Sequence, residues 1–74
     1  MNKDRRKMIE EAVGKLNDAM ATLEQARDEE QEYLDNMPEN LQSSDKASQA
    51  EEAIDALDSA VNSIDDAISS VEGL

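Results

Sequence analysis

Apolar residues recur along both halves of the chain at the spacing of an amphipathic helix. In the second half, three blocks of seven residues each begin with alanine and a branched apolar residue. A further apolar residue follows three positions later, and the blocks span 53–59, 60–66 and 67–73. The first half repeats this scheme from Ala12 to Ala26. A seven-residue period with apolar positions three and four apart predicts helices that pack like a coiled coil.

A proline divides this pattern into two helices. Pro38 disfavours helical geometry at the residue before it, so we expect the first helix over 3–36. A loop over 37–43 then holds one short 3₁₀ turn, and the second helix is expected over 44–72. A short connection makes two neighbouring helices antiparallel. The sequence therefore predicts an all-α fold, a single helical-hairpin domain over 1–74.

Capping residues define the ends of the second helix. Ser44 is the favoured N-cap, because a short side-chain oxygen accepts a hydrogen bond from an unpaired N–H of the first turn. Ser48 is the competitor, since Glu51 three residues later completes a capping box. Gly73 is expected to close the helix in the left-handed conformation that glycine adopts without strain.

The apolar stripe is too wide, and the core too small, for one isolated hairpin. The stripe takes three positions in seven, whereas a simple helix pair needs two. Ten of the apolar residues are alanine, and Leu, Ile and Val number only thirteen, a content typical of chains that do not fold alone. We therefore expect self-association, most simply into a dimeric four-helix bundle. Its predicted core is Val13, Leu16, Met20, Leu23, Ile54, Leu57, Val61, Ile64 and Ile68.

The net charge of -12 is unevenly distributed along the chain. Residues 1–15 hold five bases and three acids, while all other residues hold two bases and sixteen acids. We expect the bases of the first helix to neutralise the end of the second helix and to pair with Asp65, Asp66 or Glu72. The alternative is a site for small anionic ligands such as nucleotides. Its residues would be Lys3, Arg5, Arg6 and Lys7.

The loop end of the predicted hairpin is acidic and holds the only aromatic residue, Tyr33. Carboxylates there surround a small apolar cluster, as in an interface centre with a charged rim. The simpler interpretation is that the cluster only closes the hairpin and that the carboxylates are solvated. The candidate partner-binding residues are Asp28, Glu29, Glu32, Tyr33, Asp35, Met37, Pro38, Glu39 and Leu41.

Several chemistries lack the residues that they need. Without histidine or cysteine there is no disulfide, thiol nucleophile, Cys/His zinc site or imidazole base. The acids are not spaced as in a calcium loop, so no metal or other cofactor is expected. Two thin helices leave little room for the pocket that a catalytic acid requires, and enzyme activity is not expected. No apolar run reaches the ~20 residues of a membrane span. One aromatic residue and an acidic total charge argue against direct nucleic-acid binding.

Three segments carry a family resemblance: DEEQEY at 28–33, DNMPENLQSS at 35–44 and EEAIDAL at 51–57. In these segments the chain resembles small acidic proteins of unassigned function from bacteriophages and prophages of Gram-positive bacteria. The resemblance implies a helical hairpin and a phage protein in the cytoplasm of a bacterial host. Phage proteins of this size often inhibit a host system. By analogy, the expected function is non-enzymatic binding to a host component, such as a defence protein, which is inhibited or sequestered.

Two other functions stay open from the sequence. The hairpin could be a structural scaffold or assembly protein that forms homo-oligomers. It could also be an oligomer that binds small anionic ligands through the basic start of its first helix. Identifying the molecule that the protein retains from a host lysate would separate all three functions.

Overall fold

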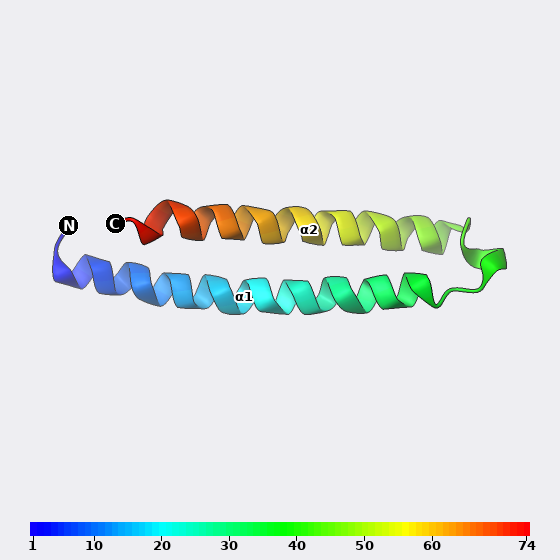
Figure 1. Ribbon diagram of the computed structural model, residues 1–74, viewed down its shortest axis with the longest axis horizontal. Coiled ribbons are helices and arrows are strands. Elements are labelled where there is room, and N and C mark those ends of the chain that lie inside the picture. Colours follow the sequence, from blue (N-terminus) through cyan, green and yellow to red (C-terminus); the bar gives the residue numbers. More distant parts are fainter.

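The fold is an antiparallel hairpin of two long helices, which confirms the predicted fold class. The computed structural model describes residues 1–74, with helix α1 over Lys3–Asp35, a 3₁₀ turn η1 over Glu39–Leu41 and helix α2 over Asp45–Glu72. The two helices lie side by side, with the loop at one end and both chain termini at the other (Figure 1). The predicted helix ends, 3–36 and 44–72, agree with the structure to within one residue.

The hairpin is a thin rod. It measures 59 × 15 × 13 Å, and its radius of gyration is 17.1 Å, whereas a compact chain of this length has a radius of gyration of about 11 Å. A rod two helices wide has no interior beyond the single line along which the helices meet. All of its chemistry therefore lies at or near the surface.

Capping by short polar side chains explains where both helices begin. Asn2 caps α1, because its side-chain oxygen accepts a hydrogen bond of 2.8 Å from the backbone N–H of Arg5. Ser44 caps α2 and accepts a hydrogen bond of 3.4 Å from the backbone N–H of Ala47. The Ser44 hydroxyl also donates to the carbonyl of Leu41, so it joins the loop to the helix. The prediction of Ser44 over Ser48 is confirmed.

The prediction for Gly73 is wrong. Its φ is -78°, and no residue of the hairpin has a positive φ. The last turn is instead closed by the backbone N–H of Leu74, which donates to the carbonyl of Val71 three residues earlier, at 3.2 Å. A helix that tightens into this 3₁₀ pattern needs no left-handed residue at its end.

Hydrogen bonds make the loop between the helices compact. The N–H of Asn36 donates to the carbonyl of Glu32 at 3.0 Å, and the N–H of Leu41 donates to that of Pro38 at 2.8 Å, which forms η1. The side-chain amide of Gln42 donates to the carbonyl of Met37 at 3.3 Å. The first helix ends just before Pro38, as expected from the missing N–H of proline.

The two helices meet along a seam of sixteen residues, spaced alternately three and four apart. Of these, only four in α2 are buried, while α1 buries no residue completely. The rest are half-buried. The nine residues predicted as an oligomer core all belong to the seam inside one hairpin, and only Ile54 and Ile68 among them are buried. The seam consists of Ile9, Val13, Leu16, Met20, Leu23, Arg27, Glu30 and Leu34 in α1, and Ala47, Ala50, Ile54, Leu57, Val61, Ile64, Ile68 and Val71 in α2.

The assignment of Ser44 as the N-cap leads to a matched pair of variants. We expect Ser44→Ala to lower the free energy of unfolding by about 1 kcal/mol, because an N–H of the first turn of α2 loses its partner. For a domain of this size that loss lowers the melting temperature by roughly 4–8 °C. Ser48→Ala is the control and should have little effect, since alanine favours a helix interior. Thermal unfolding followed by circular dichroism measures both, and an equal or larger loss for Ser48→Ala would contradict the assignment.

Candidate functional site

The loop end of the hairpin carries the candidate partner-binding residues, and the structure leaves all but one of them exposed. Tyr33 and Leu41 are the large apolar side chains of this region that reach solvent, with exposed fractions of 48% and 40%. Met37 is the exception, because only 8% of it is exposed; it closes the hairpin instead of offering a contact. We call the remaining eight residues the loop-end surface: Asp28, Glu29, Glu32, Tyr33, Asp35, Pro38, Glu39 and Leu41.

Tyr33 lines a shallow hollow between the two helices. The hollow has a volume of about 360 Å³ and is lined by Glu30 and Tyr33 of α1 and by Lys46, Gln49 and Ala50 of α2. Lys46 is the only base between residues 28 and 52, a stretch with nine acids. Sequence reasoning missed Lys46, although its place in the first turn of a helix that follows a short loop was a usable signal. Lys46 brings one positive charge to the hollow that the only aromatic residue lines.

One ion pair joins the two helices, and it interrupts the apolar seam. Arg27 occupies a seam position, and its guanidinium donates to Asp58 of α2 at 3.0 Å and to the neighbouring Asp28 at 3.2 Å. The hydrogen bond to Asp58, and then that to Asp28, raises the pKa of Arg27 above its ordinary value. The side chains of Arg27 and Asp58 are 28% and 48% exposed, and pairs as exposed as this contribute little to stability.

The basic start of α1 lies beside the end of α2, but the expected ion pairs are absent. The only ion pairs of the chain are the two made by Arg27, so the prediction that these bases pair with Asp65, Asp66 or Glu72 is wrong. Lys3, Arg5, Arg6 and Lys7 are all exposed. Long exposed side chains lose conformational entropy when they are held in one geometry, and exposed ion pairs rarely offset that loss.

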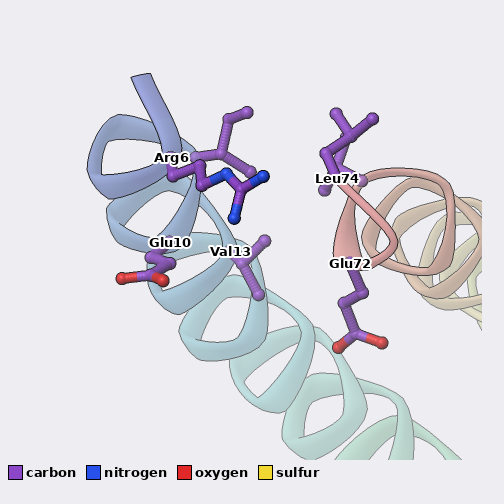
Figure 2. Close-up of a pocket in the computed structure, with 7 residues that line it drawn as sticks. Arg6, Glu10, Val13, Glu72 and Leu74 are labelled. Carbon is purple, nitrogen blue, oxygen red and sulfur yellow. The ribbon is translucent and has the colours of Figure 1, made fainter. Parts of the chain in front are cut away.

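Arg6 contributes to a second hollow, of about 390 Å³, where α1 begins and α2 ends. Figure 2 shows its guanidinium directed into the space between the helices, opposite Leu74, while the carboxylates of Glu10 and Glu72 point elsewhere. Ile9, Val13 and Val71 form the apolar walls. Arg6 is the only base among the lining residues, which also include two acids, so the hollow offers an anion less positive charge than the four bases of the sequence suggest.

The structure adds few other sites for chemistry. It holds no group of three or more carboxylates placed to bind a metal ion. None of its helices is both long and apolar enough to cross a membrane. No protein-family model, curated protein or solved structure matches the chain. The resemblance to small acidic phage proteins therefore stays a prediction, and the loop-end surface is the candidate site.

The crowded carboxylates predict that salt stabilises the hairpin. Residues 28–52 hold nine acids and only one base, and the acids repel one another in the folded rod more than in an extended chain. Salt screens exposed charges beyond about 10 Å at 0.1 M, so the melting temperature should rise as sodium chloride is added. The variant with Glu29→Gln and Glu32→Gln should show a smaller rise. A melting temperature that does not depend on salt would show that this repulsion is negligible.

Proposed function

We propose that this protein is a non-enzymatic interaction protein, which self-associates through its helices and binds another protein through the loop-end surface. The observation that carries the proposal is the incomplete seam: α1 buries no residue completely, although six of its eight seam residues are apolar. A helix in a stable fold buries its apolar face against another surface. The half-exposed seam therefore supports a fold that is completed by association.

The loop-end surface supports binding of a second protein. Tyr33 and Leu41 are partly exposed, as are the five acids of this surface, and tyrosine is enriched among the residues that dominate binding energy. A net charge of -12 would attract a basic partner over a long range. The resemblance to small acidic phage proteins favours a host protein as that partner, which binding would inhibit or sequester.

A structural scaffold is the second candidate. The observation that favours it is the shape, a rod 59 Å long and only 15 Å wide that could link other subunits. A scaffold would retain a structural protein of the same virus, whereas an inhibitor would retain a host protein. Mass spectrometry of the material bound to the immobilised protein distinguishes the two.

Self-association predicts a mass in solution of at least twice the 8.2 kDa of one chain. Light scattering after gel filtration at micromolar concentration measures that mass. Leu57→Asp should dissociate and unfold the protein, because it places a charge in a seam with little apolar area to spare. Ser59→Asp also introduces a carboxylate, at an exposed position of α2 that faces away from the seam, and should do neither. A folded monomer of the unchanged protein would refute self-association.

Charge reversal at the loop-end surface tests partner binding. The variant with Glu29→Lys and Glu32→Lys should melt no lower than the parent protein, because it removes like charges from an exposed face. It should bind the retained partner about tenfold more weakly or worse, a loss of roughly 1.4 kcal/mol or more, measured by calorimetry. The control is Glu10→Lys with Glu11→Lys, the same change at the other end of α1. If the loop-end variant binds as well as its control, the loop end serves only to close the hairpin.

A further inference from the structure

The flanks of the seam differ sharply between the two sides of the hairpin. On one side, the position directly before every second seam residue is alanine in six of eight cases. We call these six residues the alanine face: Ala12, Ala19, Ala26, Ala53, Ala60 and Ala67. On the other side, six acids stand directly after the remaining seam residues: Glu10, Glu24, Glu51, Asp58, Asp65 and Glu72. Covering the alanine side affects the single charge of Lys46, whose position continues the same series, whereas covering the other side would remove six carboxylates from water.

The two hollows show that each flank keeps to one side. In antiparallel helices that pack like a coiled coil, equivalent flanking positions face each other. Tyr33 and Lys46, which belong to the same series as the alanines, line one hollow together. Glu10 and Glu72, which belong to the acidic series, line the other. The alanines of α1 and α2 therefore lie on one common side, and Tyr33 marks the border between the alanine face and the loop-end surface.

The exposed area of the whole hairpin leaves room for a dimer interface. The hairpin exposes 5574 Å², whereas a compact protein of its mass exposes roughly 4,500 Å². A standard interface removes about 800 Å² from each partner, which is slightly less than the difference. A row of alanines along a rod 59 Å long is matched in length and chemistry by a second copy of the same row.

Charge decides how the second copy is oriented. The loop half of the rod, residues 28–52, holds nine acids and one base, whereas the terminal half, residues 1–15 and 61–74, holds six acids and five bases. Two copies with their loops at the same end would place the two strongly acidic halves together. Reversing one copy places each acidic half against a nearly neutral half, which lowers the repulsion.

We propose that two copies dock through their alanine faces with their long axes reversed, so that the loops lie at opposite ends of a four-helix bundle. This inference rests on the self-association proposed above and adds its face and direction. In this arrangement α1 packs on α1 of the second copy, and Ala19 lies at the centre opposite itself. Ala12 then lies opposite Ala26, because both are seven residues from the centre. The loop tips extend past the partner's chain termini and stay free to bind another protein.

Cysteine cross-linking tests this arrangement, since the chain has no cysteine of its own. A disulfide forms only where two Cβ atoms come within about 4.5 Å, and helices that meet through alanine approach closely enough for it. Under mild oxidation Ala19→Cys should give a covalent dimer. Ala12→Cys and Ala26→Cys should each stay unlinked alone and link when mixed. Asn17→Cys, near the centre of α1 but on the acidic side, should not link.

Each other outcome has a definite meaning. A reversed arrangement does not allow Ala12→Cys to link with Ala67→Cys, because α1 would then have to face α2 of the second copy. That product, with the loops at the same end, would overturn the inference and leave self-association intact. A dimer by light scattering that none of the alanine-face cysteines can link would also overturn it. A monomer by light scattering would refute the proposed self-association itself, and circular dichroism confirms that each variant is folded.

Discussion

The thin contact between two alanine-rich helices is the constraint on which the rest of the structure depends. The small side chains of Ala47 and Ala50 let α2 lie close to α1, and these are the two most completely buried residues of the hairpin. Small side chains, however, remove little apolar area from water, and each buried methylene adds only about 0.8 kcal/mol. The hairpin thus gains close packing and gives up an enclosed interior. Its function has to be carried by its faces and ends.

The position of the charged side chains also follows from the lack of an enclosed interior. With no interior to hold ion pairs, nearly all charged side chains point into solvent, and the single pair between the helices, Arg27 with Asp58, sits where the apolar seam is interrupted. The remaining acids collect around the loop and the bases around the start of α1. The rod is therefore electrically polar along its length, although its total charge has one sign. Such an uneven distribution of charge influences the orientation in which molecules associate more than the affinity between them.

The helical parts were predictable from the sequence, since a seven-residue period, Pro38 and Ser44 act locally and point to the same answer. Features that depend on where side chains settle were not. The ion pair of Arg27 depends on the position of Asp58 on α2, and the burial of Met37 depends on how the loop packs at the end of the hairpin. The pairing expected for Lys3 to Lys7 fails because flexible exposed side chains gain little from a fixed geometry. For the candidate site, the sequence located the acidic loop end but not the hollow that Tyr33 shares with Lys46.

The near-identity of the seven-residue blocks has a consequence for how this protein can change in length. The blocks of α1 that are apolar at both seam positions can face any of the three blocks of α2 with similar packing, so the apolar seam alone does not fix which residues lie opposite one another. The compact loop and the bond from Arg27 to Asp58 supply that information. Adding or deleting one block in each helix would move the two ends apart or together by about 10 Å while leaving the chemistry of each end intact. The number of blocks thus sets the distance between the loop end and the terminal end of the hairpin.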